Sequence, residues 1–179
     1  VSDGSIRYGL NAVKSVGKTV VESIVKERDA CGRYKSLEDF IERMSGKDIN
    51  RRTVENLIKA GAFDSMGATR KQYVSVYAAI MEQVSEKKKK SVAGQMSLFD
   101  FVPEEEKQNY EIKIPDVGEY KKELLLAFEK EVLGFYISGH PLEEYESFWR
   151  KNITAITSDF IVDEETRECK VHDGEQVWI

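Results

Sequence analysis

The stretch of this sequence that constrains the fold most strongly is Val13-Lys14-Ser15-Val16-Gly17-Lys18. Apolar residues at helical spacing lie on both sides of it, namely Ile6, Leu10 and Val13 before the glycine and Val21, Ile24 and Val25 after it. Because Gly17 interrupts this periodicity, the pattern predicts two helices joined by a tight hairpin. Glycine also lets the backbone approach a ligand, and the helix that follows begins with amides that lack an intrahelical acceptor.

A phosphate group is the natural ligand of such a helix start, and Lys14 and Lys18 add positive charge beside it. A helix-hairpin-helix of this kind grips the DNA backbone without reading the bases. The candidate DNA contacts in this first hairpin are Lys14, Ser15, Val16, Gly17 and Lys18. The same spacing also fits a plain helical turn with solvated lysines, and the spacing alone leaves both interpretations open.

Further helices follow the first hairpin. Ser36 is a suitable N-cap for a short helix, and Asn50 is one for a helix that ends at Gly61. The sequence Thr69-Arg70-Lys71-Gln72 then fits a capping box at the start of a long helix whose apolar stripe runs from 73 to 84. Residues 1–84 therefore read as two helical pairs, each interrupted by glycine, which indicates a tandem helix-hairpin-helix domain.

The second hairpin, from Gly61 to Lys71, has a longer connector than the first. It contains Asp64, which repels phosphate, and Phe63, whose packing we expect to matter more than any ligand. We therefore predict a mainly structural hairpin here, with Arg70 and Lys71 as candidate phosphate contacts.

The segment 85–118 reads as a flexible linker, because it contains the lysine run 87–90 and the acidic run 104–106. A solvated linker has no reason of its own to carry the apolar side chains in Gln95-Met96-Ser97-Leu98-Phe99. This pattern is typical of an extended peptide whose anchors are buried only in the pocket of a partner. The alternative is a short strand or turn folded back onto a neighbouring domain.

Residues 119–150 read as a further helical segment, with one helix from Tyr120 to Tyr136 that ends before Pro141. Its expected apolar side consists of Leu124, Leu125, Phe128, Val132 and Phe135. From 151 onward the pattern changes to strand, over residues 159–162 and 177–179, with a turn signal at Asp173-Gly174. Since the chain begins at Val1 and its last residues are apolar, we expect a fragment whose 151–179 segment is the truncated start of a β domain.

The net charge of −5 hides a division between the two halves of the chain. Residues 1–90 carry 18 Lys and Arg against 12 Asp and Glu, whereas residues 91–179 carry 9 against 20. Phosphate attraction therefore favours the front half as the partner of nucleic acid. The acidic rear half is expected to face away from DNA.

Several other classes of site are not expected from the sequence. No run of about 18 apolar residues is present, so we predict no membrane-spanning segment. Cys31 and Cys169 are far apart and read as reduced thiols of a cytoplasmic protein, and with His140 and His172 they do not form a zinc pattern. No nucleotide loop, nucleophile elbow or paired catalytic carboxylate stands out, so we expect no catalytic residue and no cofactor in this chain.

Four stretches resemble the bacterial DNA polymerase III alpha subunit, the family C replicative polymerase. They are residues 6–17, residues 50–64, residues 129–142 and the peptide 95–99. The first two are similar to the end of the fingers region and the segment after it, and the third resembles a signature that precedes an OB domain in that family. The matches follow the order of the family and extend over most of the chain. Their order favours the branch with an internal clamp motif.

The resemblance implies a role in DNA replication without chemistry in this chain. The family's palm domain, which uses carboxylates and Mg²⁺, would lie outside it. The chain would hold duplex DNA through its hairpins, while Gln95, Met96, Ser97, Leu98 and Phe99 bind the sliding clamp and residues 151–179 begin an OB-like domain. Other replisome proteins are further candidate partners.

Two alternatives remain open from the sequence. One is a DNA-repair or scaffold module that combines a helix-hairpin-helix with a clamp-binding peptide and has no polymerase attached. The other is a helical protein-interaction domain that does not bind DNA.

Overall fold

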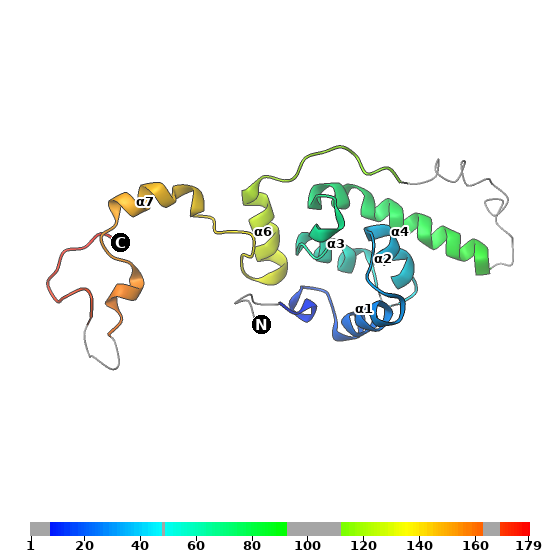
Figure 1. The fold of residues 1–179 in the computed structure, drawn as a ribbon, viewed down its shortest axis with the longest axis horizontal. Coiled ribbons are helices and arrows are strands. Elements are labelled where there is room, and N and C mark those ends of the chain that lie inside the picture. The colour runs from blue at the N-terminus through cyan, green and yellow to red at the C-terminus, as the bar shows by residue number, and fades with distance from the viewer. Residues whose placement is uncertain (1–7, 48, 93–111, 163–168) are drawn as a thin grey trace. The chain divides into compact units, whose positions relative to one another are not determined.

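The computed structural model describes residues 8–47, 49–92, 112–162 and 169–179. The described residues form helices connected by turns, and none of them lies in a β-strand. The helices are η1 (Leu10–Ala12), α1 (Lys18–Cys31), α2 (Leu37–Met44), α3 (Arg51–Lys59), η2 (Asp64–Met66), α4 (Arg70–Val92), α6 (Lys122–Leu133), η5 (Glu143–Tyr145), α7 (Glu146–Asn152) and η6 (Thr157–Phe160), with η marking 3-10 helices (Figure 1). The prediction of a mainly α fold is confirmed.

The predicted helix starts are confirmed by their hydrogen bonds. The Ser36 hydroxyl accepts from the Asp39 amide at 3.1 Å, and the Asn50 carboxamide accepts from the Thr53 amide at 2.9 Å. At α4 the capping box forms in both directions. The Thr69 hydroxyl accepts from the Gln72 amide at 3.2 Å, and the Gln72 side chain accepts from the Thr69 amide at 2.8 Å.

The hydrophobic core lies among the first four α-helices, with α2 and α3 both packed against α4. Its most deeply buried members include Met44 of α2 and Val54 and Leu57 of α3. Phe63 is also buried, and its ring meets that of Phe40 edge to face with centroids 5.0 Å apart. The packing role predicted for Phe63 is therefore confirmed, and it fixes the connector between α3 and α4.

The first predicted helix is much shorter than the apolar spacing from Ile6 to Val13 indicated. Only Leu10–Ala12 form a single 3-10 turn, and the residues before 8 lie outside the described part of the chain. Val13 leaves the turn in an extended conformation, with φ −73° and ψ 128°, and its side chain is buried. The helical conformation therefore ends at Ala12, and the extended Val13 places its side chain in the core.

Helix α4 is longer than its apolar stripe, which ends at 84. It continues to Val92, and so includes the start of the segment expected to be a linker. Glu and Lys are good helix formers, which suits this extension. The Lys88 ammonium also donates to the Ser45 carbonyl just after α2, so the lysine run is fixed to the helical domain at one point.

The other end of the expected linker also packs on the helices. Ile112 lies against the core, and the Gln72 carboxamide donates to the Pro115 carbonyl at 2.9 Å. Residues 112–121 therefore pack against the start of α4.

Helix α6 buries a different face from the predicted one. Leu126, Glu129, Val132 and Leu133 are buried, whereas Leu124 is exposed. Val132 and Leu133 belong to the same core as α1–α4, and α6 packs against α3. Of the predicted stripe only Val132 is buried, and the stripe left out Glu129, whose side chain is the most buried of the helix.

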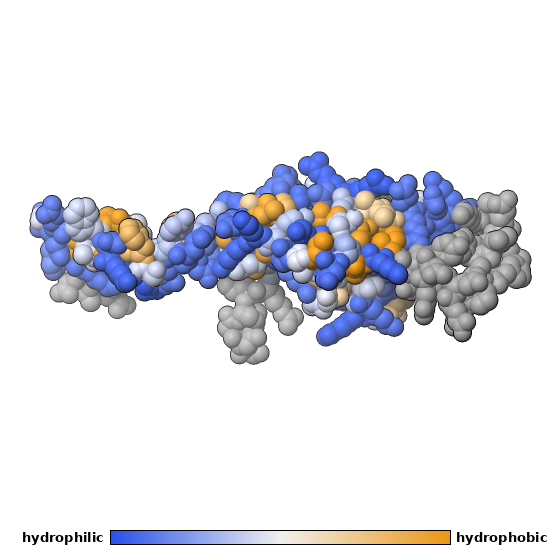
Figure 2. Space-filling model, turned by 90° about the horizontal axis from the view of Figure 1, so that it is seen from above, coloured by the Kyte–Doolittle hydropathy of each residue, from blue (hydrophilic) through white to orange (hydrophobic). Residues whose placement is uncertain are grey.

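The chain divides into an N-terminal unit, residues 1–138, and a C-terminal unit, residues 139–179. In the C-terminal unit most large apolar side chains are exposed, among them Phe148, Ile161 and Trp178. Figure 2 shows apolar residues of the chain in orange at the surface. Among the described residues, no helix is both long enough and apolar enough to cross a lipid bilayer.

The strand predicted over 159–162 does not form, because residues 157–160 turn into η6. The Ile156 amide donates to the Asp159 carboxylate at 3.0 Å and the Asp159 amide donates to the Ile156 carbonyl at 2.8 Å. These local bonds take up backbone groups that a strand would have offered to a neighbour. The turn at Asp173-Gly174 is confirmed, with Gly174 at φ 82°, and the OB-like assignment of 151–179 stays a prediction.

Candidate nucleic-acid interface

The first hairpin, residues 13–18, is a tight turn held by two buried valines. Val13 and Val16 point into the core, and the Val16 amide donates to the Val13 carbonyl at 3.0 Å. Ser15 adopts φ 65°, a left-handed conformation that is uncommon for residues other than glycine. Burial of the valines therefore leaves Lys14, Ser15 and Gly17 exposed on the outer side of the turn.

Three hydrogen bonds from neighbouring helices hold this turn in place. The buried Asn56 carboxamide donates to the Lys14 carbonyl at 2.6 Å, and the buried Thr53 hydroxyl donates to the Ser15 carbonyl at 3.2 Å. From α6, the Val132 carbonyl accepts from the Lys14 amide at 2.8 Å. All three are neutral contacts to the backbone, so they position the hairpin without neutralising the charge of Lys14.

The start of α1 is open to an anion. Its N-cap is Gly17, no side chain caps the helix, and no acidic residue lies in its first turn. Within the described part of the chain, the amides of Lys18 and Thr19 have no acceptor. Lys18 itself is exposed and 3.7 Å from Glu22, an exposed pair of the kind that contributes little. Two lysines and unpaired amides thus face the solvent together.

Gly17 leaves space at this helix start. A Cβ placed on it would approach only the Thr19 hydroxyl, at 3.9 Å, among the atoms outside its own neighbourhood. Its φ of −76° is one that any residue can adopt. The fold itself therefore does not require glycine here, whereas close approach of a ligand to the backbone would.

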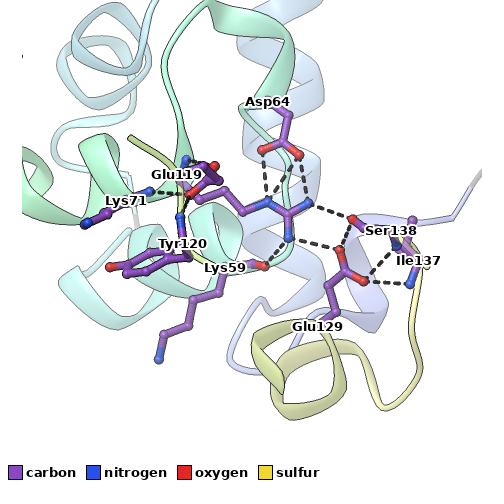
Figure 3. Close-up of polar contacts among 9 residues, drawn as sticks. Lys59, Asp64, Lys71, Glu119, Tyr120, Glu129, Ile137 and Ser138 are labelled. Atoms are coloured by element: carbon purple, nitrogen blue, oxygen red, sulfur yellow. Dashed lines mark hydrogen bonds and ion pairs between the residues drawn. The ribbon is translucent and has the colours of Figure 1, made fainter. Parts of the chain in front are cut away.

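The second hairpin carries a buried arginine where the sequence predicted a phosphate contact. Arg70 is only 6% exposed, and its guanidinium donates to the Asp64 carboxylate at 2.8 Å and to the Glu129 carboxylate at 3.0 Å (Figure 3). It also donates to the Lys59 carbonyl at 3.2 Å, which lies at the end of α3. The guanidinium that the sequence predicted as a phosphate contact thus already donates to groups inside the domain.

Glu129 is the inner partner in this network and has no exposed surface. Besides Arg70, it accepts from the amides of Ile137 and Ser138 at 2.7 and 2.9 Å and from the Ser138 hydroxyl (Figure 3). Burial alone would raise the pKa of Glu129, but the hydrogen bonds from Ser138, Ile137 and Arg70 outweigh it and lower the pKa. Glu129 is therefore held as a carboxylate that links α6 to the second hairpin.

A second carboxylate occupies the start of α4. Glu119 accepts from the Arg70 amide at 2.8 Å and from the Lys71 amide at 3.1 Å (Figure 3). Lys71 is half-buried, and its ammonium lies 6.0 Å from the centroid of the Tyr120 ring. The backbone amides of the two predicted contacts of this hairpin, Arg70 and Lys71, thus already bind a carboxylate.

Sequence reasoning missed both Glu119 and Glu129 as members of this site. Glu129 had one signal, since it lies among the apolar residues of the α6 stripe, where a charged side chain needs a partner. Glu119 had none, because nothing in its local sequence marks a contact with residues 70 and 71. The peptide 95–99 lies outside the described residues.

The fold and the hairpin geometry define the class of this chain. Residues 1–73 match the family model of the helix-hairpin-helix motif. Both hairpins discussed above begin within that match. Residues 1–73 thus carry a helix-hairpin-helix motif, in which the start of α1 is open among the described residues and the start of α4 is filled by Glu119.

Curated relatives extend this assignment. The chain is similar to DNA polymerase III subunit alpha of Borreliella burgdorferi, with 42% identity over 146 residues, 82% of this chain and 13% of the relative. The corresponding protein of Mycobacterium leprae is 42% identical over 137 residues, 76% of this chain and 12% of the relative. That of Vibrio cholerae is 35% identical over 159 residues, 87% and 13% respectively.

The chain is therefore a homologue of one segment of the bacterial DNA polymerase III alpha subunits. The resemblance indicated by the sequence motifs is confirmed. The chain spans only about an eighth of the length of the relatives that it matches.

Proposed function

We propose that this chain is the DNA-holding and sliding-clamp-tethering portion of a bacterial replicative DNA polymerase. The observation that carries the DNA-holding part is the open start of α1, where amides without an acceptor among the described residues lie near exposed Lys14 and Lys18 in the sequence. Double-stranded DNA offers a regular row of phosphates to such a site, and contacts of this kind do not depend on base sequence.

Catalysis is assigned to the parent protein. DNA-directed synthesis with Mg²⁺ belongs to a palm domain elsewhere in the polymerase, and we assign no catalytic residue to this chain. Because the parent acts on the bacterial chromosome, the proposal places the protein in the cytoplasm. Other replisome proteins are partners in the same proposal, for which the acidic second half of the chain offers a surface.

The clamp tether is assigned to Gln95-Met96-Ser97-Leu98-Phe99. Burial of Leu98 and Phe99 in a pocket would contribute roughly 1.5–3 kcal/mol each before the cost of ordering the peptide. An isolated contact of this size is weak. When the clamp and the polymerase are both attached to one DNA, the effective concentration of the clamp near the peptide rises, and this keeps the enzyme on the template.

DNA binding is tested by titrating the chain with duplex DNA at several salt concentrations. We expect Lys14→Glu and Lys18→Glu to weaken binding and to reduce the slope of log affinity against log salt by about 1 each. Lys26→Glu makes the same charge change on an exposed part of α1, away from the hairpin, and is the matched control. Equal affinity of the hairpin variants and the control would remove the first hairpin as a DNA site.

Clamp binding is tested by titrating the chain against a bacterial sliding clamp. The double variant Leu98→Ala/Phe99→Ala should lose binding, whereas Phe101→Ala, an apolar residue just outside the peptide, should retain it. If the double variant binds the clamp as tightly as the unaltered chain does, the clamp contacts another part of the chain.

A further inference from the structure

The start of α4 is completely satisfied by hydrogen bonds, unlike that of α1. The amides of Arg70 and Lys71 donate to the two oxygens of the Glu119 carboxylate. The Gln72 amide donates to the Thr69 hydroxyl, and the Tyr73 amide begins the intrahelical series by donating to the Thr69 carbonyl. A phosphate oxygen that approached this helix would therefore find its amides already bound.

Glu119 reaches this position from another part of the chain. It is 48 and 49 residues from the amides that it accepts, and it precedes α6. Its own segment is fixed nearby, because the Gln72 carboxamide donates to the Pro115 carbonyl at 2.9 Å. The contact is thus a tertiary one, in which an oxyanion is seated on two adjacent amides as a phosphate would be.

A third amide also binds Glu119, because the carboxylate accepts from the Tyr120 amide at 2.7 Å. The Lys71 ammonium lies 6.0 Å from the centroid of the Tyr120 ring. Arg70 does not compete for it with its guanidinium, which binds Asp64 and Glu129 on the inner side. The helix start of the second hairpin is therefore built for an oxyanion and filled by one from the same domain.

We propose that Glu119 is an internal substitute for a DNA phosphate, and that it closes the second hairpin so that only the first grips the DNA backbone. The proposal rests on the proposed function, because it concerns which of the two hairpins contacts DNA. Removal of the carboxylate would leave the Arg70 and Lys71 amides without this acceptor. The start of α4 would then carry amides without an acceptor, as the start of α1 does among the described residues.

The first experiment uses inorganic phosphate as the probe and the amide NMR signals of the 179-residue chain as the readout. Phosphate should move the signals of Lys18 and Thr19 in the unaltered chain and leave those of Arg70 and Lys71 in place. In Glu119→Ala it should move all four, and in Glu119→Gln the response of Arg70 and Lys71 should be smaller. Unmoved Arg70 and Lys71 signals in Glu119→Ala would overturn the proposal.

The second experiment measures the affinity for duplex DNA against salt. Glu119→Ala should bind more tightly, with a slope of log affinity against log salt that is steeper by about 0.9, one additional phosphate contact. Glu123→Ala removes the same charge from a neighbouring exposed position in the first turn of α6 and serves as the control. An equal gain in Glu123→Ala would mean that only the general charge had changed, and the proposal would be wrong.

The two experiments separate this proposal from the proposed function. If phosphate and DNA fail to affect Lys18 and Thr19 in any variant, the assignment of the first hairpin fails. If those signals respond but Arg70 and Lys71 remain unaffected in Glu119→Ala, only the role of Glu119 fails. None of the variants changes Thr69 or Gln72, so we expect their capping box to keep the start of α4 defined while Glu119 is changed.

Discussion

The two hairpins of this chain share a sequence pattern, a glycine followed by a helix with lysine or arginine in its first turn, and yet their helix starts differ. At α1 the amides of Lys18 and Thr19 have no acceptor among the described residues, whereas at α4 those of Arg70 and Lys71 are bound by Glu119. The comparison teaches that the exposure of amides at a helix start depends on carboxylates from elsewhere in the fold. The hairpin pattern by itself does not determine it.

The hairpins also differ in how they are anchored. The first is held by neutral donors, the Asn56 carboxamide and the Thr53 hydroxyl, which bind backbone carbonyls. The second is held by charged groups, with Arg70 between Asp64 and Glu129. A charged anchor in a buried place is strong only while both partners are present, so it makes the second hairpin the more vulnerable of the two.

The largest effect is expected from Glu129→Ala. The change leaves the Arg70 guanidinium buried without its inner partner and also removes the acceptor of the Ile137 and Ser138 amides. We expect the free energy of unfolding to fall by about 3–5 kcal/mol, measured by denaturant titration. Glu131→Ala, on the same helix, removes an exposed carboxylate whose partner Lys59 keeps its ion pair with Glu55, and it should cost less than about 1 kcal/mol. Comparable losses in the two variants would show that the buried network does not hold the second hairpin.

Acid should weaken the hydrogen bonds to Glu129 and leave those of the first hairpin unchanged. Because the folded-state pKa of Glu129 lies below its ordinary value of 4.5, its contribution is present above that value and is lost as the pH falls below it. The Ile137 and Ser138 amide signals should shift in this acidic range, while the Lys14 amide, which donates to a backbone carbonyl, should not. Glu129→Gln should abolish the shift at residues 137 and 138. A shift that persists in that variant would assign the titration to another group.

The local features of this comparison could be predicted from the sequence. The N-caps Ser36 and Asn50 and the capping box of Thr69 and Gln72 depend on residues three positions apart, and all three form as expected. Val13 was also placed correctly on the core side by its apolar spacing, whereas Val16, a candidate DNA contact in the sequence, is buried in the core. Short-range hydrogen bonding and burial are the physics that a single sequence displays most directly.

The features that separate the hairpins could not be predicted in the same way. Arg70 looked like a free cation because its partner Glu129 is 59 residues away, and Glu119 is nearly as distant from the amides that it binds. The strand over 159–162 was also wrong, since the Asp159 carboxylate satisfies a local turn. In each case an acidic side chain takes up a hydrogen-bonding role that the sequence pattern did not indicate.

The smallest effect on stability, and the sharpest test of the open hairpin, is expected from Gly17→Ala. The added methyl group meets only the Thr19 hydroxyl at 3.9 Å, and the φ of −76° suits alanine, so the free energy of unfolding should change by no more than about 0.5 kcal/mol. The methyl group would stand beside the unpaired amides of Lys18 and Thr19, where a DNA phosphate must approach. Duplex affinity should therefore fall several-fold.

Gly9→Ala is the matched control, because a Cβ at Gly9 meets no described atom within 4 Å and its φ of −79° is equally permissive. Gly9 precedes the short turn η1, away from the start of α1, so its variant should keep both stability and DNA affinity. A selective loss of affinity in Gly17→Ala would place the phosphate on the backbone of the first hairpin. Equal affinity in the two variants would instead mean that Lys14 and Lys18 attract DNA at a distance, and the comparison between open and closed helix starts would lose its functional meaning.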